Sequence, residues 1–152
     1  MSDNIVREYD IDMNDCFEEL LSLKEAAEEY HENPVQDTKA KVLAQLILRA
    51  FEDNEALTLA DIVNGSSTVI GLMDTFGRHW FALFTDIYEV GADGTFKFSS
   101  LLPVRDLIRY AFEFNDYEGL VVNPYTDNVV FGKDELECAL GIIQVKEGME
   151  NE

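Results

Sequence analysis

The spacing of apolar residues changes once along the chain, and this change limits the fold more than any other feature. Residues 14–33 and 38–54 carry apolar side chains at helical spacing, with acidic residues on the opposite face. Beyond residue 66 the apolar segments become short and rich in β-branched and aromatic residues. We therefore expect two amphipathic helices, followed by strands mixed with further helices.

The two helical segments are separated by a short link that contains a proline. Asn33-Pro34 should end the first helix, because the residue before a proline is disfavoured in the α region. Asp37 is the expected N-cap of the second helix. A link of this length predicts an antiparallel helical hairpin, which we place within residues 1–55, after a loose acidic lead-in over residues 1–12.

The second half of the chain predicts a sheet with covering helices. The expected elements are a hairpin from residues 67–74 and 78–86, a helical turn at 88–94, a short alternating strand at 95–100, a helix at 103–114 with Pro103 at its first position, strands at 119–122 and 128–131, a helix at 133–145 and a frayed acidic tail at 146–152. The fold class is α+β (mixed α/β). We expect one domain over residues 1–152, with a twisted mixed sheet of about five short strands.

The charge balance limits the kinds of partner. The chain has 31 Asp and Glu against 11 Lys and Arg, a formal net charge of -20. Such a charge repels phosphate backbones and anionic membrane surfaces, so we predict no nucleic-acid binding and no membrane binding. Solvation is the usual role of acidic surfaces. A protein partner is the expected one, and the charge is compatible with a basic protein.

The N-terminus and the two cysteines bear on the compartment. The first residues lack a basic region followed by an apolar one, and no run approaches the ~20 apolar residues that a membrane span needs. We expect a cytoplasmic protein. Cys16 and Cys138 lie far apart, each within an expected helix, and we predict reduced and partly buried thiols.

The sequence holds no complete catalytic or metal-binding signature. Residues 10–21 match a calcium loop at its first three ligand positions, but they lack the glycine at the sixth position and the glutamate at the twelfth. His31 and His79, the only histidines, are too far apart in sequence to predict a zinc site. Phosphate-binding glycine loops and nucleophile motifs do not occur. We predict no metal, no cofactor, no catalytic residue and no enzymatic activity.

Three segments resemble the N-terminal domain of the bacterial SseB protein family. They are Arg78 to Asp86, Leu101 to Phe112 and Gly119 to Leu136, with Phe84-Thr85 and Asn123-Pro124 as the most specific pieces. The resemblance covers residues 67–140. It implies a fold more than an activity, because the family's biochemical role is poorly defined and supplies no catalytic residues.

Two strand ends are the candidate binding surface. If the strands that precede them are parallel neighbours, Thr85-Asp86 and Asn123-Pro124-Tyr125 emerge at the same sheet edge, where open α/β sheets bind ligands. A turn alone accounts for the polar residues that interrupt the two apolar segments here. Pro124 should end the strand and hold Asn123 in an extended conformation, and Tyr125 to Asn128 should form the turn into the next strand.

Aromatic residues around this strand add two candidates, Trp80 and Tyr88. Alternation places Trp80, Ala82 and Phe84 on one face of the strand, and Phe81 and Leu83 on the other. Core packing is the favoured role for this strand. If Trp80 or Tyr88 is exposed, it becomes a candidate interface anchor, because interface hot spots favour Trp and Tyr.

These observations favour a small non-enzymatic SseB-like binding or adaptor module. An acidic, immunity-type inhibitor that neutralises a basic partner is the first alternative. Sensing of an amino acid or another metabolite is the second, and it rests on the serine-sensitivity phenotype for which the family is named.

Overall fold

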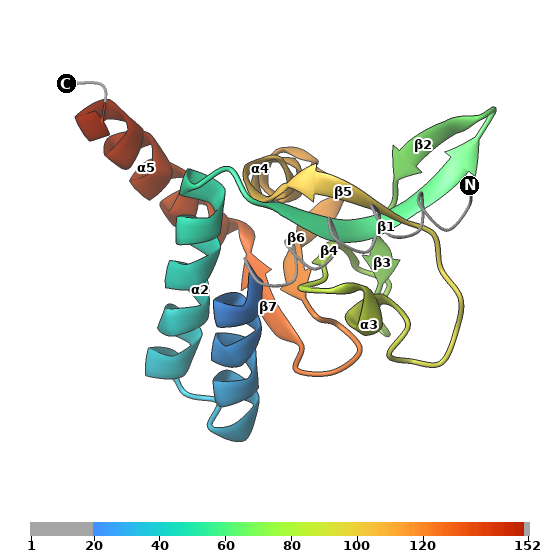
Figure 1. Cartoon of the computed structure of the whole chain (residues 1–152), viewed down its shortest axis with the longest axis horizontal. Helices are drawn as coiled ribbons and strands as arrows, with labels where there is room; N and C mark the ends of the chain where they lie inside the picture. Colours follow the sequence, from blue (N-terminus) through green and yellow to red (C-terminus); the bar gives the residue numbers. More distant parts are fainter. Residues whose placement is uncertain (1–19, 151–152) are drawn as a thin grey trace, which may run out of the picture.

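The computed structural model describes residues 20–150, which fold into helices packed on two sheets (Figure 1). The α+β fold class is confirmed. The expected single sheet of about five strands is wrong, because the described residues form seven strands in a three-stranded and a four-stranded sheet. The acidic lead-in, most of the calcium-like stretch and Cys16 lie outside the described residues.

An N-terminal helical hairpin is present, as expected. It consists of a helix over residues 20–32 and of α2 (Gln36–Phe51). The expected N-cap Asp37 is wrong, because α2 begins at Gln36, two residues earlier than a cap at Asp37 requires, and Val35 takes the N-cap position. Thr38 closes the turn instead. Its hydroxyl donates to the Asn33 carbonyl (2.6 Å) and its oxygen accepts from the Val35 N–H (3.2 Å), so the first turn keeps a side-chain partner.

The three-stranded sheet is antiparallel, in the order β2-β1-β5. The sequence pattern did not predict its central strand β1 (Glu55–Val63), whose five consecutive buried residues hide any alternation. β2 (Ser66–Val69) pairs with β1 and not with the expected hairpin partner. The strand expected at 95–100 lies further along the chain, where β5 covers Ser99–Pro103.

The four-stranded sheet is mixed, in the order β3-β4-β6-β7. Its strands are β3 (Leu72–Met73), β4 (His79–Leu83), β6 (Tyr117–Val122) and β7 (Val129–Gly132). The expected hairpin is confirmed at β3 and β4, where Leu72 pairs with Trp80. β4 and β6 are parallel, and β6 and β7 are antiparallel.

The remaining helices are α3 (Ile87–Val90), α4 (Val104–Glu113) and α5 (Lys133–Glu150). Pro103 lies at the N-cap of α4 and not at its first helical position. The tail expected to fray from residue 146 is helical to Glu150, because Lys146 lies over the Phe51 ring (5.6 Å) and Glu147 pairs with Arg105 (2.5 Å). Cys138 is exposed on α5, so its expected partial burial is wrong. None of the described helices is long and apolar enough to cross a membrane.

Alternation along β4 divides the buried residues into two clusters, one on each face of the four-stranded sheet. Phe81 and Leu83 join the larger cluster, which includes the helical hairpin, α4 and α5. Ala82 and Phe84 join a smaller cluster with Leu57 of β1 and Val121 of β6. The predicted division of faces is confirmed. The two sheets meet here, because the Phe84 N–H donates to the Leu57 carbonyl (2.8 Å).

Phe84→Ala should lower the free energy of unfolding by about 3 to 5 kcal/mol, because Phe84 is fully buried where the two sheets join. Phe96→Ala is the matched control, and because Phe96 is 83% exposed it should change this free energy by less than about 0.5 kcal/mol. Urea denaturation measures both. Equal losses in the two variants would contradict the assignment of Phe84 to the core.

Candidate functional site

The two strand ends singled out in the sequence lie side by side. β4 and β6 are parallel, with Leu83 opposite Val122, and the Asn123 N–H donates to the Leu83 carbonyl (2.9 Å). The Asn123 side chain then reaches across to Thr85. Its Oδ1 accepts from the Thr85 N–H (3.0 Å), and its Nδ2 donates to the Thr85 Oγ1 (3.0 Å). We call this pair of contacts the Asn123–Thr85 latch.

The latch is buried, so Thr85 and Asn123 are not part of the exposed candidate binding surface but hold its strand ends together. Thr85 is 1% exposed and Asn123 is fully buried. The expected extended conformation of Asn123 is wrong, because its φ is 46°, in the left-handed region. Asparagine tolerates this region better than most residues. The turn to Asn128 is confirmed, since the Thr126 and Asn128 N–H groups both donate to the Asn123 carbonyl (3.2 and 2.9 Å).

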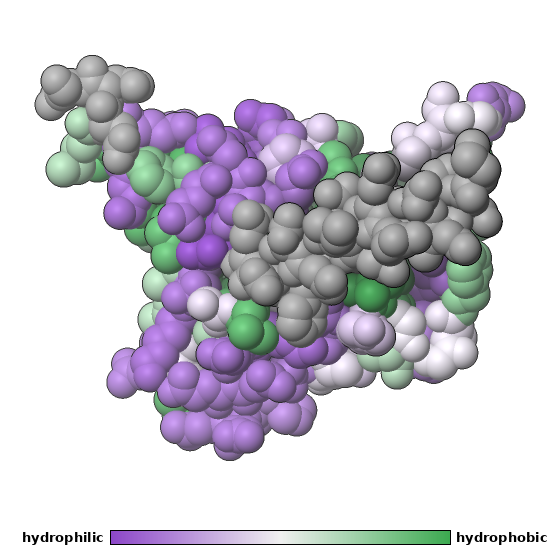
Figure 2. Space-filling model, in the orientation of Figure 1, coloured by the Kyte–Doolittle hydropathy of each residue, from purple (hydrophilic) through white to green (hydrophobic). Residues whose placement is uncertain are grey.

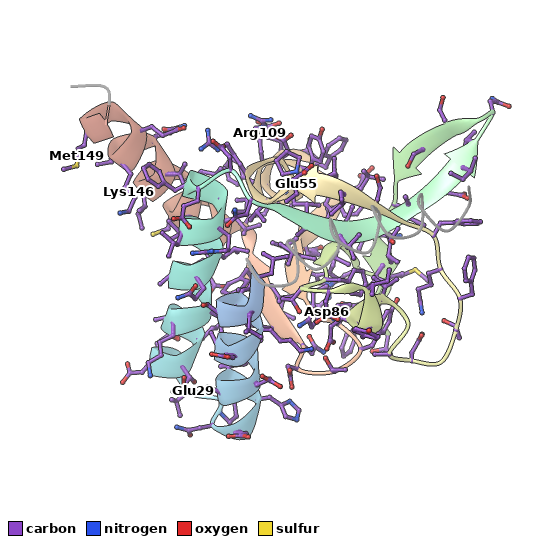
Figure 3. The ribbon with its side chains drawn as sticks, viewed as in Figure 1. Glu29, Glu55, Asp86, Arg109, Lys146 and Met149 are labelled. Atoms are coloured by element: carbon purple, nitrogen blue, oxygen red, sulfur yellow. The ribbon has the colours of Figure 1, made fainter. Side chains whose placement is uncertain are left out.

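Asp86, labelled in Figure 3, connects the same region to the helical hairpin through an ion pair. Its carboxylate caps α3 by accepting from the N–H groups of Tyr88 (2.9 Å) and Glu89 (3.1 Å). Lys24 pairs with Asp86 (2.9 Å) and Glu89 (3.5 Å). Burial lowers the pKa of Lys24, but the hydrogen bond and charge of Asp86, with those of Glu89, outweigh this effect and raise the pKa overall. Asp86 is thus a buried structural residue.

Beyond the latch, an open cleft of about 480 Å³ lies on the sheet face that carries Trp80, Val121 and Val130. Three of the predicted site residues line it, namely Trp80, Pro124 and Tyr125. The sequence reasoning missed the others, which are Leu72, Met73, Asp74, Arg78, Val121, Asn128 and Val130. We call it the Trp80–Tyr125 cleft.

Asp74 organises one wall of this cleft. Its Oδ1 accepts from the N–H groups of Phe76 (2.8 Å) and Arg78 (3.0 Å), and its Oδ2 accepts from the Trp80 indole N–H and the Arg78 Nε (both 2.9 Å). The hydrogen bond from Trp80 is the largest cause that lowers the pKa of Asp74 to about 2. Asp74 is therefore ionised at neutral pH and fixes the indole of Trp80 at the cleft.

Tyr125 forms the facing wall. Its ring packs on Phe84 (centroids 5.8 Å apart), and the Lys97 ammonium lies 4.4 Å from its centroid. Burial, followed by the charge of Asp93, raises the pKa of the Tyr125 hydroxyl. Lys97 also pairs with Asp93, so its charge is matched. Tyr125 thus contacts both the core and a neutralised ion pair.

Several large apolar side chains near the cleft are exposed. Met73 on the cleft wall is 67% exposed, Phe76 lies on the β3–β4 turn, and Tyr88 on α3 is 77% exposed and outside the cleft lining. The Arg78 guanidinium lies over the rings of Phe76 and Trp80 (5.1 and 5.8 Å). Figure 2 shows hydrophilic residues gathered over the helical hairpin at the lower left, with paler residues to its right.

Side chains that could bind a metal ion do not cluster in the described part of the chain. Within residues 20–150 no three His, Cys, Asp or Glu side chains lie close enough to hold a metal ion. Both histidines are exposed, His31 at the end of the first described helix and His79 on β4. Comparison of the chain with protein-family models, with curated proteins and with solved structures gives no match.

Asn123→Ala should lower the free energy of unfolding by about 2 to 4 kcal/mol, because it leaves the buried Thr85 N–H without its acceptor and places alanine in the left-handed region. Asn128→Ala is the control. Asn128 has a similar φ of 39° but is exposed, so its loss should be only about 1 kcal/mol. Chemical denaturation compares the two. A smaller loss for Asn123 than for Asn128 would rule out the latch as a stabilising contact.

Asp74→Asn should flatten the acid dependence of stability. The fold lowers the pKa of Asp74 from 3.8 to about 2, so its ionised form stabilises the native state above pH 3.8, and this contribution is lost as the pH falls toward about 2. The difference in stability between wild type and Asp74→Asn should therefore shrink over that window. Urea midpoints across the window measure it, and Asp61→Asn, an exposed change on β1, is the control. A difference that stays constant would contradict this role.

Proposed function

We propose that this chain is a non-enzymatic protein-binding module whose Trp80–Tyr125 cleft receives an apolar side chain of a basic partner protein. The observation that carries the proposal is the cleft itself, which lies on a face of the four-stranded sheet and is lined mainly by apolar residues and by the aromatic rings of Trp80 and Tyr125. Its volume of about 480 Å³ lies within the range of natural ligand pockets. Trp and Tyr are the residues that most often anchor protein interfaces.

The cleft is preorganised, which favours binding. Asp74 holds the Trp80 indole, while Phe84 and Lys97 both contact the Tyr125 ring. Side chains already fixed in the free protein lose little conformational entropy when a partner is bound. The latch beneath them supplies a rigid base, because it joins the two strand ends through buried hydrogen bonds.

The net charge of -20 favours a basic partner. Arg78 in the cleft lining is paired with Asp74, and Lys97 over the Tyr125 ring is paired with Asp93, so these two cations do not oppose an incoming positive charge strongly. Complementary charge raises association rates and makes binding sensitive to salt. The same charge supports the second candidate, an acidic inhibitor that neutralises a basic toxin. The SseB-like resemblance agrees with a non-enzymatic role, and it stays a prediction from the motifs.

Trp80 is the only tryptophan, so its fluorescence reports on the cleft. Titration with a peptide of alternating Lys and Leu should shift this fluorescence, and the apparent affinity should fall as salt is added. A peptide of the same length with Lys and Ser has the same charge without the apolar side chains, and it should bind at least ~10-fold more weakly. Equal binding of both peptides would contradict a role for the cleft.

Two tyrosine variants distinguish the cleft from the neighbouring surface. Tyr125→Ala should weaken binding of the Lys and Leu peptide at least ~10-fold. Tyr88→Ala removes the same type of side chain outside the cleft, so it should change the affinity for this peptide less than ~2-fold. Met73→Gln changes an exposed cleft residue without touching the core, so it should weaken binding with unchanged thermal stability. Loss of binding in Tyr88→Ala alone would move the interface to α3. A thermal-shift response to serine or a related metabolite would favour the sensing alternative.

A further inference from the structure

The β1–β2 hairpin projects from the body of the protein as an arm (Figure 1). Residues 61–70 are exposed throughout, except for half-buried Val69. The run from Ile62 to Met73 contains no charged residue, although 28% of the chain is charged. Ile62 and Val63 leave about half of their surface in solvent. This acidic protein therefore presents an uncharged and partly apolar β-arm.

The register of the arm shows which backbone groups face outward. Asn64 and Gly65, with φ of 52° and 79°, form a two-residue turn of the kind that closes tight hairpins. The closing pair is Val63 and Ser66, and pairing continues to Ala60 and Val69. Because hydrogen-bonded and non-bonded pairs alternate in antiparallel sheets, Ser66 and Thr68 face β1, while the N–H and C=O groups of Ser67 and Val69 face away from it.

The other outer strands of the described sheets carry features that discourage pairing. β3 has only two residues, and β5 ends at Pro103, which has no N–H to donate. At the end of β7 the Gly132 N–H is taken by the Glu135 carboxylate (3.1 Å). β2 has no charge and no proline, and no side chain among residues 20–150 caps its outer edge with a hydrogen bond as Glu135 caps Gly132. The outer edge of β2 is therefore of the kind that natural proteins usually protect against pairing with another chain.

We propose that β2 pairs antiparallel with β2 of a second copy of this chain, around a two-fold axis, and so joins two three-stranded sheets into one. The occupant follows from the charge. Two copies that each carry -20 repel one another, so a close contact between them is opposed least at a charge-free segment, and β2 is such a segment. Asp61, the charge on the arm, lies on the inner strand and not at the edge. An antiparallel strand pair is also self-complementary, as a two-fold interface requires.

Self-pairing and partner binding should respond to salt in opposite directions. Salt screens the repulsion between two acidic copies, so it should strengthen the dimer, whereas it should weaken the proposed binding of a basic partner at the cleft. The contact is short, and interfaces of this kind are weak and depend on concentration. The arm and the cleft are different surfaces, so failure of one proposal leaves the other standing.

Sedimentation velocity of the full chain over a concentration series, at low and at high salt, tests the proposal. We expect a monomer–dimer equilibrium that moves toward dimer as salt is added. Ser67→Pro removes an outward N–H without breaking a bond to β1, and Ser67→Lys places a charge at the edge. Each should weaken dimerisation at least ~10-fold. Ser22→Lys makes the same residue change on the exposed surface of the first described helix, and it should leave the dimer intact.

Hydrogen exchange of the wild-type protein gives a second readout that does not depend on a variant. The amides of Ser67 and Val69 should gain protection as concentration rises, while those of Ser66 and Thr68, already bonded to β1, should change little. A monomer at all concentrations and salts would overturn the proposal. So would a dimer that Ser67→Pro and Ser67→Lys leave unchanged, or one that forms without added protection at Ser67.

Discussion

The Asn123–Thr85 latch is the interaction on which the rest of the structure depends. Parallel strands are not joined by a tight turn, so their ends must be held together by contacts made elsewhere. Here the Asn123 side chain bonds the backbone and the side chain of Thr85 in a fully buried position. An unsatisfied group there would cost far more than an exposed one. The latch therefore fixes where β4 and β6 end.

The segments that follow Thr85 and Asn123 position the residues around the cleft. After Thr85, Asp86 caps α3 and pairs with Lys24, which joins the helical hairpin to this end of the sheet. After Asn123, the turn presents Tyr125 against Phe84. Trp80, one strand-length earlier on β4, completes the facing wall through its bond to Asp74. A structural contact between buried polar groups thus positions an exposed apolar surface.

The sequence predicted much of this, and its errors have physical causes. Helical periodicity and strand alternation identified the hairpin, α4, β6 and the faces of β4, because those patterns report directly on burial. β1 was missed because it is buried on both faces over five residues and does not alternate. Pro124 suggested an extended Asn123, but the hydrogen bonds of the latch stabilise the left-handed conformation instead. At Asn123, tertiary hydrogen bonds outweigh the local conformational preference that the following proline imposes.

The candidate site was predicted in position and only partly in composition. The juxtaposition of the two strand ends followed from the motifs, but the sequence could not show that Thr85, Asp86 and Asn123 turn inward while Trp80, Pro124 and Tyr125 line a cleft. Burial depends on tertiary contacts, such as the ion pair between Asp86 and Lys24 of the helical hairpin. Asp74 and Arg78 were missed for a similar reason, since their roles depend on a turn that folds back onto Trp80.

Hydrogen exchange at two sites of the free protein, followed by nuclear magnetic resonance, tests the claim of a latch and a preformed cleft most directly. The sites are the Thr85 amide and the Trp80 indole N–H, whose acceptors are the Asn123 and Asp74 side chains. We expect the Thr85 amide to exchange only through global unfolding and the Trp80 indole to exchange more slowly than a free indole. Exchange of Thr85 at the rate of an open loop, with an unprotected indole, would rule out both the latch and the preformed cleft.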